Sequence, residues 1–370
     1  MQQSATLFVA ISDGDNAPLW QALSKGGEPF EVRGLHAVEG GVLLQLAGTL
    51  ACAGTLEDER DAHPMLAEAV PLVASHRLLL SACELSLGKL LTLCDWLRSR
   101  ATLVDIGLVR SLLDEQRPAA IQLLLHEPQC GADDLQQLAE LLEADLNLIT
   151  MVPQLAQPGL LLMDMDSTAI QIECIDEIAK LAGVGEQVAA VTELAMQGRL
   201  DFSESLRARV ATLKDHPVTI LEQVAAAIPI TQGLPQLIAA LHQRGWQVGI
   251  VSGGFTFFTE RLKPLLGLDF THANTLGIEG GRLSGIVIGE IVDASIKART
   301  LREWADSLGL DMRQTVAAGD GANDLKMLAA AGLGVAFHAK PVVRAQAAAA
   351  INSGGIEAIY YLLADTRDLL

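Results

Sequence analysis

The fold of this chain is decided by the stretch Leu160-Leu-Leu-Met-Asp-Met-Asp-Ser-Thr168. Its apolar first half follows Pro158-Gly159 and predicts a buried strand of a parallel sheet. Asp164 and Asp166 interrupt the apolar run where that strand should end, and ligands bind at this edge of open α/β sheets. A strand followed by an acidic turn would give the same Asp-x-Asp pattern, so the stretch alone leaves both interpretations open.

Two later strands are also predicted to end in polar turns that contain glycine. Trp246 to Val251 is followed by Ser252-Gly253-Gly254, and Thr315 to Ala318 is followed by Gly319-Asp-Gly-Ala-Asn-Asp324. The alternation of strands and helices predicts a doubly wound parallel α/β sheet. Carboxylates suit Mg²⁺, glycines allow backbone N–H groups to approach phosphate, and Lys297 would neutralise charge on a transferred phosphoryl group.

The chain is predicted to contain more than one domain. The order of strands and helices before the linker is that of ferredoxin-like α+β units. Two such units are expected if the strand Arg77 to Leu85 both closes the first unit and opens the second. These units resemble ACT-type domains, which implies regulation or association. The predicted parts are residues 1–76, residues 77–152, a linker at 153–159, and an α/β domain at 160–370 with a helical cap at about 171–230.

The composition indicates a protein of the cytoplasm. The 370 residues carry 45 acidic and 26 basic side chains, a formal charge of −19, which argues against nucleic acid or an anionic membrane as a partner. Five cysteines without Cys-x-x-Cys spacing indicate neither a disulfide framework nor a zinc site. The start of the chain lacks the features of a signal peptide, and no apolar run approaches the length needed to span a bilayer.

Six ordered blocks between about Leu160 and Tyr361 resemble the haloacid-dehalogenase-like phosphatases, and among them the phosphoserine phosphatases. The blocks are Asp-Met-Asp-Ser-Thr at 164–168, Glu173 within Glu-Cys-Ile-Asp-Glu-Ile-Ala, Ser-Leu-Arg-Ala-Arg-Val at 205–210, Val-Ser-Gly-Gly-Phe at 251–255, Lys297, and Gly-Asp-Gly-Ala-Asn-Asp at 319–324. The resemblance implies Mg²⁺-dependent hydrolysis of O-phospho-L-serine through an aspartyl-phosphate, as the last step of serine biosynthesis.

The resemblance also implies roles for individual residues. Asp164 is the expected nucleophile, and Asp166 is expected to protonate the departing seryl oxygen and then deprotonate the attacking water. The expected metal ligands are the carboxylate of Asp164, the backbone carbonyl of Asp166, and Asp320, with Asp324 near them. The expected phosphate contacts are Ser252, Gly253 and Lys297, with Asn323 close by.

Substrate choice is expected to come from the cap. An amino-acid phosphate needs an anion beside its ammonium group and a forked cation for its carboxylate, and Glu173 and Arg209 meet these needs. In the family, Met196 and Phe202 correspond to apolar residues that close over the substrate. Without the resemblance, Glu173 and Arg209 would be interpreted as solvated helix residues, and Met196 and Phe202 as ordinary core residues of the cap. Arg207 is the alternative clamp, but it should point elsewhere on a helix.

Other functions share parts of this pattern. A related phosphatase, or a phosphotransferase with an acceptor such as homoserine, would use the same catalytic residues. A non-catalytic amino-acid sensor is disfavoured because Asp166 and Lys297 are both present. The N-terminal units are expected to form a homodimer and to bind an amino-acid effector such as serine. Cys174, where the family frequently has a small hydroxyl residue, is expected to be buried and unreactive.

Overall fold

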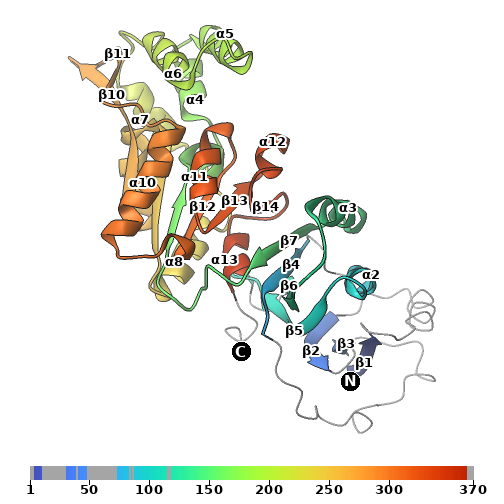
Figure 1. The fold of residues 1–370 in the computed structure, drawn as a ribbon. Coiled ribbons are helices and arrows are strands. Elements are labelled where there is room, and N and C mark those ends of the chain that lie inside the picture. The colour runs from blue at the N-terminus through green and yellow to red at the C-terminus, as the bar shows by residue number, and fades with distance from the viewer. Residues whose placement is uncertain are drawn as a thin grey trace. The chain divides into compact units, whose positions relative to one another are not determined.

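The computed structural model describes residues 4–10, 31–38, 41–47, 73–82, 85, 87–114 and 118–364 (Figure 1). They divide into two compact units, each considered by itself. One contains the described residues up to Met151 together with residues 361–364, and the other is Val152–Tyr360. No helix in these ranges is both long and apolar enough to cross a lipid bilayer.

The larger unit is built on a seven-stranded sheet in the order β11-β10-β9-β8-β12-β13-β14. Its central strand β8 (Leu160–Met163) pairs in parallel with β9 (Gln247–Phe255) on one side and β12 (Thr315–Gly319) on the other. All four residues of β8 are buried, which explains why it is apolar throughout. The outer strands are β10 (Phe270–Glu279), β11 (Arg282–Ile288), β13 (Leu333–Phe337) and β14 (Ala349–Ile351).

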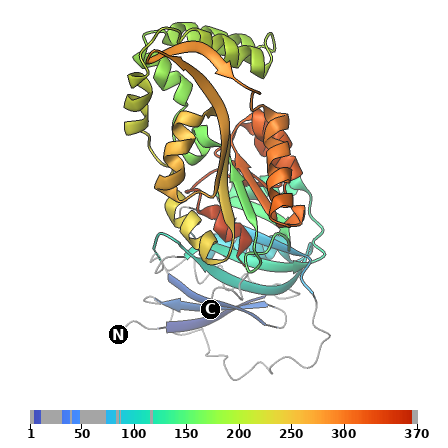
Figure 2. The same cartoon turned by 90° about the vertical axis from the view of Figure 1, so that its left-hand side faces the viewer.

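Helices cover both faces of this sheet, as Figure 2 shows. The doubly wound α/β fold predicted from the sequence is therefore confirmed, although the sequence did not predict β14. Only β11 runs antiparallel to its neighbour in the sheet, because it returns from β10 through a hairpin. The helices are α8 (Leu234–Gln243), α9 (Thr256–Leu266), α10 (Ala294–Ser307), α11 (Leu325–Ala330) and α12 (Pro341–Arg344). A last helix, α13 (Ala358–Leu363), starts in this unit and ends in residues that group with the smaller unit.

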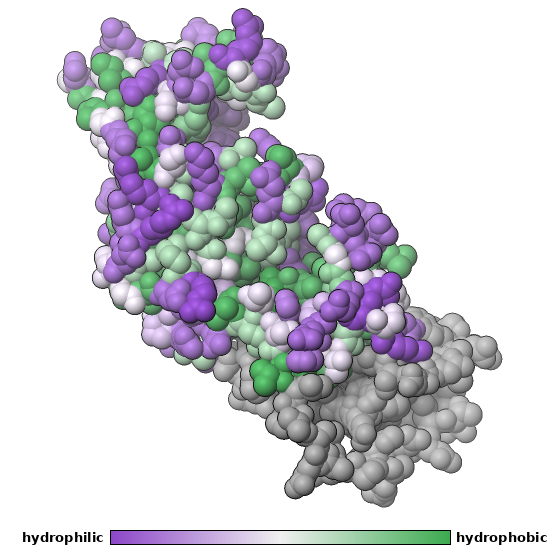
Figure 3. Space-filling view, viewed as in Figure 1, coloured by the Kyte–Doolittle hydropathy of each residue, from purple (hydrophilic) through white to green (hydrophobic). Residues whose placement is uncertain are grey.

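The cap lies in the chain between β8 and α8, where the sequence predicted it. Its helix α6 starts at the N-cap Asp201, whose side chain accepts a hydrogen bond from the Glu204 backbone at 2.8 Å, while the Glu204 side chain accepts one from the Asp201 backbone at 3.0 Å. The same helix packs against β11. Figure 3 shows the surface hollowed beneath the cap. The cap helices are α4 (Cys174–Leu181), α5 (Gly185–Met196), α6 (Phe202–Ala211) and α7 (Thr219–Ala226).

The smaller unit contains a four-stranded antiparallel sheet in the order β5-β6-β4-β7 with the strand and helix sequence β-α-β-β-α-β, which is the ferredoxin-like arrangement. Its strand β4 pairs with β6 on one side and β7 on the other. The expectation that this strand also closes the preceding unit is therefore wrong, because both of its edges are occupied. The elements are β4 (His76–Ser81), α2 (Leu87–Leu97), β5 (Thr102–Arg110), β6 (Pro118–His126), α3 (Ala132–Leu142) and β7 (Asp145–Thr150).

A separate three-stranded sheet in the order β1-β3-β2 precedes it. These strands are β1 (Ser4–Ala10), β2 (Glu31–Val38) and β3 (Gly41–Ala47), all antiparallel to their neighbours. The remainder of the predicted unit at 1–76 lies largely outside the described residues.

The end of the described chain belongs to the smaller unit, whereas the sequence assigned it to the α/β domain. The guanidinium of Arg77 donates hydrogen bonds to the carbonyl oxygens of Leu363, at 2.6 Å, and Met151, at 3.0 Å. Gln122 donates to the carbonyl of Ala364, and Tyr361 accepts from the Leu112 backbone at 3.0 Å. Arg77 and Gln122 are almost completely buried, so these bonds satisfy polar groups of the interior.

Candidate active site

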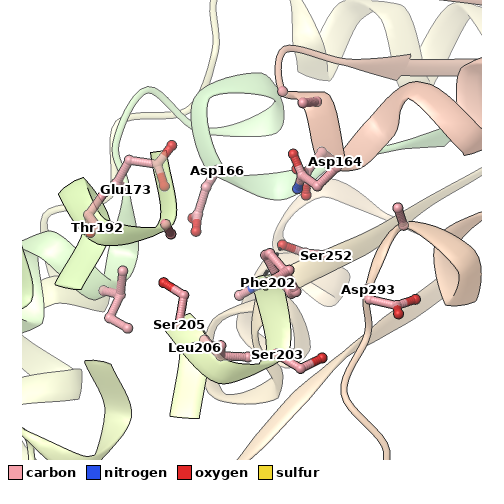
Figure 4. Close-up of a pocket in the computed structure, with 18 of the residues that line it drawn as sticks. Asp164, Asp166, Glu173, Thr192, Phe202, Ser203, Ser205, Leu206, Ser252 and Asp293 are labelled. Carbon is pink, nitrogen blue, oxygen red and sulfur yellow. Dashed lines mark hydrogen bonds between the residues drawn. The ribbon is translucent and has the colours of Figure 1, made fainter. Parts of the chain in front are cut away.

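A cavity of about 870 Å³ lies between the carboxyl edge of the larger sheet and the cap (Figure 4). Its walls come from the turn after β8, the cap helices, the turn after β9 and the turn after β12. All of the predicted site residues line this cavity except Lys297 and Asp324, which lie buried behind its wall. Residues distant in the sequence are thus brought to one place by the parallel sheet.

Behind the wall, Lys297 bridges two carboxylates. Its Nζ atom is 2.7 Å from Oδ2 of Asp164 and 2.8 Å from Oδ1 of Asp324, and all three side chains are buried. Burial lowers the pKa of Lys297, but the two carboxylates outweigh this effect and raise the pKa above its usual value. Asp293 caps the helix that carries Lys297 by accepting hydrogen bonds from the backbone of Ser295 and Ile296. The lysine is therefore cationic and firmly placed.

Three carboxylates form a cluster that suits a hard metal ion. One carboxylate oxygen each from Asp164, Asp320 and Asp324 lie within 4.8 Å of one another. Burial and the neighbouring carboxylates raise the pKa of Asp320 to about 7, and burial raises that of Asp324 to about 6 although Lys297 opposes it. These carboxylates repel one another, and one lysine, Lys297, balances them. A divalent cation would relieve the repulsion, and carboxylate oxygens prefer hard cations. The residues present therefore fit a metal.

The turn after β12 is shaped to bring Asp324 to the cluster. A Cβ atom on Gly319 would lie 2.4 Å from Cγ of Asp324, so only a glycine leaves room for that carboxylate. Oδ2 of Asp324 accepts a hydrogen bond from the Gly321 backbone at 3.0 Å. Asn323 lines the cavity beside it, where the sequence predicted a phosphate contact.

The turn η2 (Met165–Ala169) presents Asp166 to the cavity. Within it Ser167 adopts a left-handed backbone conformation with φ of 55°. Burial raises the pKa of Asp166 well above its usual value, and the charges of Glu173 and Asp164 add to this effect, whereas hydrogen bonds from Cys174 oppose it. Its Oδ1 atom has no hydrogen-bond partner within the described chain. A carboxyl with a raised pKa can hold a proton and deliver it to a leaving group.

Cys174 is buried, as the sequence predicted. Burial raises the pKa of its thiol far above the usual range, and the neighbouring Asp166 carboxylate adds to the shift. The thiolate that would be needed for reactivity is therefore strongly disfavoured.

The turn after β9 is packed directly against the cap. A Cβ atom on Gly253 would lie 2.7 Å from Cζ of Phe202, so the absence of a side chain lets the cap approach the turn. Oγ of Ser252 accepts a hydrogen bond from the Gly254 backbone at 2.9 Å. Asn274, which sequence reasoning did not single out, donates to the Gly253 carbonyl at 2.9 Å and accepts from the Val292 backbone at 2.9 Å. This buried asparagine positions the turn, but nothing in the sequence signalled it, because other polar residues surround it in the same strand.

The cap supplies one anion and one forked cation to the cavity. Oε1 of Glu173 accepts a hydrogen bond from Ser167 at 2.8 Å, and burial raises the pKa of Glu173. Burial lowers the pKa of Arg209, although Asp176 and Glu173 oppose this effect, and its Nε atom has no hydrogen-bond partner in the described chain. Arg207 is exposed and is not among the residues that line the cavity.

The two predicted closing residues differ in exposure. Phe202 is half-buried against Gly253, whereas the Met196 side chain is 72% exposed at the cavity. An exposed methionine at this place is not part of the cap core, so it is free to pack on a ligand. The cavity is also lined by polar residues that sequence reasoning missed, including Thr192, Ser203, Ser205, Asp293, Lys326 and Lys340.

Known proteins are similar to this chain in sequence. The model of the haloacid dehalogenase-like hydrolases matches residues 159–332. A phosphoserine phosphatase from Vibrio cholerae is 55% identical over 253 residues, which cover 68% of this chain and 77% of that relative.

Solved structures give the same result. The crystal structure of a probable phosphoserine phosphatase from Vibrio cholerae in its unliganded form matches with a TM-score of 0.66 at 45% identity, and it covers 78% of this chain and 86% of its own. A substrate-bound phosphoserine phosphatase complex matches with a TM-score of 0.54 at 40% identity, covering 56% of this chain and 99% of its own. The chain therefore belongs to the haloacid dehalogenase-like hydrolase family, and within it to the phosphoserine phosphatases.

Proposed function

We propose that this protein hydrolyses O-phospho-L-serine to L-serine and phosphate, as the last step of serine biosynthesis. The observation that carries the proposal is that one cavity combines two kinds of recognition. Asp164 and Asp320 line it beside the buried Lys297, a set suited to phosphoryl transfer, and Glu173 and Arg209 face it from the cap, a set suited to an amino acid. The relatives that share this fold carry the same activity in their names.

In the proposed first step, a carboxylate oxygen of Asp164 attacks phosphorus, and the bond from phosphorus to the seryl oxygen breaks. Asp166 gives its proton to that oxygen, which leaves L-serine and an aspartyl-phosphate. In the second step Asp166 takes a proton from water, the resulting hydroxide attacks phosphorus, and the bond to Asp164 breaks to release phosphate. Lys297 neutralises charge that develops on the phosphoryl group.

The remaining site residues are proposed to bind and orient. Ser252, Gly253 and Asn323 would donate hydrogen bonds to the phosphate, Glu173 would bind the ammonium group, and Arg209 the carboxylate. Phe202 and Met196 would close over the substrate and exclude water. We propose Mg²⁺ as the metal, held by the side chains of Asp164, Asp320 and Asp324 and the backbone carbonyl of Asp166, where it would neutralise negative charge on phosphoryl oxygens.

A panel of phosphomonoesters assayed with and without Mg²⁺ tests this function. We expect a Mg²⁺-dependent preference for O-phospho-L-serine, and we expect Asp164→Asn to lose nearly all turnover while Asp311→Asn, a surface control, retains it. A panel without that preference would contradict the substrate, and an active Asp164→Asn would contradict the mechanism. Addition of homoserine, with a search for new phosphoesters, separates hydrolysis from phosphotransfer, and any turnover excludes a pure sensor.

We further propose that the two N-terminal units, at 1–76 and 77–152, associate two copies of the chain and bind an amino-acid effector. Support comes from the ferredoxin-like arrangement of β4 to β7, which can be extended between copies through its edge strands. Light scattering of the full chain with and without serine tests this proposal. A concentration-independent monomer whose activity ignores serine would contradict it. The cytoplasmic location predicted from the sequence likewise stays a prediction.

A further inference from the structure

Ser205 lies in the cap one helical turn before Arg209. Residues four apart on a helix are neighbours on one face, and both of these line the cavity. Figure 4 shows the Ser205 hydroxyl directed toward Asp166 and Glu173, whereas Ser203 on the same helix points away, on the side of Asp293. The face of α6 that turns toward the reacting groups thus carries a hydroxyl beside the guanidinium.

The Ser205 hydroxyl can be compared with those of Thr192 and Thr212, which donate to backbone carbonyls. A serine or threonine inside a helix usually donates to a carbonyl of the preceding turn. Thr192 does so, with Oγ1 at 3.0 Å from the Val188 carbonyl, and Thr212 bonds the Arg209 carbonyl at 2.7 Å. Ser205 is only 2% exposed and lines the cavity, and its hydroxyl is directed into the space that a ligand would fill.

On the neighbouring guanidinium, the buried Nε atom of Arg209 has no hydrogen-bond partner in the described chain. A buried donor without an acceptor costs free energy, so this atom beside a cavity indicates that a ligand supplies the acceptor. A carboxylate has about four lone-pair sites, which is enough for a guanidinium fork and one hydroxyl at the same time. An ammonium group offers no acceptor and belongs beside Glu173.

We propose that Ser205 determines substrate specificity by donating a hydrogen bond to the substrate carboxylate, together with Arg209. This inference rests on the proposed function, because it assumes an amino-acid phosphate in the cavity. It predicts that the protein distinguishes O-phospho-L-serine from O-phosphoethanolamine, which has the same phosphate and ammonium groups but no carboxylate.

Ser205→Ala tests the inference, with Ser203→Ala as the matched control on the same helix. For Ser205→Ala we expect the KM for O-phospho-L-serine to rise about tenfold or more, with kcat changed by less than about threefold. The Ki of O-phosphoethanolamine, measured as a competitor of phosphoserine, should be unchanged. Ser205→Thr keeps the hydroxyl and should restore much of the affinity, and Ser203→Ala should match the parent protein.

Three results would overturn the inference. They are an unchanged KM in Ser205→Ala, an equal loss of affinity for both ligands, or the same loss in Ser203→Ala. An unaltered Ki for O-phosphoethanolamine also shows that the variant is folded, so a misfolded protein is not mistaken for a specific effect. Failure of the proposed function is distinct from these results, because the parent protein itself would then show no preference for phosphoserine.

Discussion

At the scale of single residues, the site depends on charges held at short distances in the interior. Lys297 is 2.7 Å from Asp164 and 2.8 Å from Asp324. Removal of one partner from such a buried ion pair strongly destabilises a protein, because it leaves a buried charge without compensation. Asp164 lies against the Lys297 ammonium group, whereas Asp166, two residues later, has a raised pKa. Two aspartates in one turn are thus suited to different tasks.

The first residue prediction concerns the forked cation of the cap. Arg209→Lys keeps the charge but loses the planar fork that binds a carboxylate through two hydrogen bonds. We expect the KM for O-phospho-L-serine to rise about tenfold to a hundredfold, with a much smaller effect on O-phosphoethanolamine. Steady-state kinetics on both ligands check this. Arg207→Lys, on the exposed face of the same helix, is the control, and an equal effect in both variants would contradict the assignment.

At the scale of elements, the contact between the turn after β9 and the start of α6 sets how closely the cap approaches the sheet. The Phe202 ring occupies the place that a side chain at Gly253 would need, and Asn274 holds the Gly253 carbonyl from β10. A small shift at this contact moves Glu173 and Arg209, which line the cavity from the cap, relative to Asp164. Displacement of reacting groups by about 1 Å can reduce the rate by roughly a hundredfold.

Gly253→Ala is therefore expected to lower kcat/KM for O-phospho-L-serine by about tenfold to a hundredfold, because its Cβ atom would meet the Phe202 ring at 2.7 Å. The temperature of thermal unfolding should change little, in contrast to this loss of kcat/KM. Gly185→Ala is the matched control, since it lies at the start of α5 with no atom within 4 Å of the added carbon, and alanine favours helices. Full activity in Gly253→Ala would show that the cap does not depend on this contact.

At the scale of the whole molecule, the metal cluster collects carboxylates from β8 and from the turn after β12, so its ionisation is linked to folding. The pKa of Asp320 is raised to about 7 and that of Asp324 to about 6, above their usual value of 3.8. At pH values between the usual pKa and these raised pKa values, the folded protein binds protons that the unfolded chain does not bind. The metal-free protein should therefore lose stability as pH rises from about 4 to about 7 and change little above that.

Mg²⁺ should reverse this trend, because it binds the deprotonated carboxylates in competition with protons. We expect saturating MgCl2 to raise the unfolding temperature, relative to EDTA, more at pH 8 than at pH 5. Thermal unfolding at the two pH values measures the difference, with Asp320→Asn as the variant in which it should shrink. An equal effect of Mg²⁺ at both pH values would contradict the assignment of the cluster as a metal site.

The smaller unit offers a prediction about stability. Arg77→Ala would leave the carbonyls of Leu363 and Met151 without the buried donor that Arg77 supplies, while Ala364 keeps its bond from Gln122, and we expect the free energy of unfolding of this unit to fall by roughly 3 kcal/mol. Urea unfolding measures the change. Arg313→Ala, which removes an exposed ion pair with Asp311 in the larger unit, should have little effect and serves as the control.

The sequence by itself determined the parts of this protein that depend on local pattern. An apolar run that ends in Asp164-Met-Asp166 predicts β8 and a ligand site at its end, because both strand burial and side-chain alternation are properties of a few consecutive residues. The strands predicted from Trp246 to Val251 and from Thr315 to Ala318, which correspond to β9 and β12, were found for the same reason. Ordered blocks of chemically specialised residues were enough to predict the family.

Only the tertiary structure decided which segments pair across the chain. In the tertiary structure, β6 and β7 occupy both edges of β4. Residues 361–364 group with the smaller unit, although more than 200 residues separate Arg77 from Leu363. The tertiary structure also showed which buried polar atoms of the described chain lack hydrogen-bond partners, as for Nε of Arg209. Pairing and satisfaction of donors depend on what long-range packing brings together, and periodicity along the chain carries no information about that.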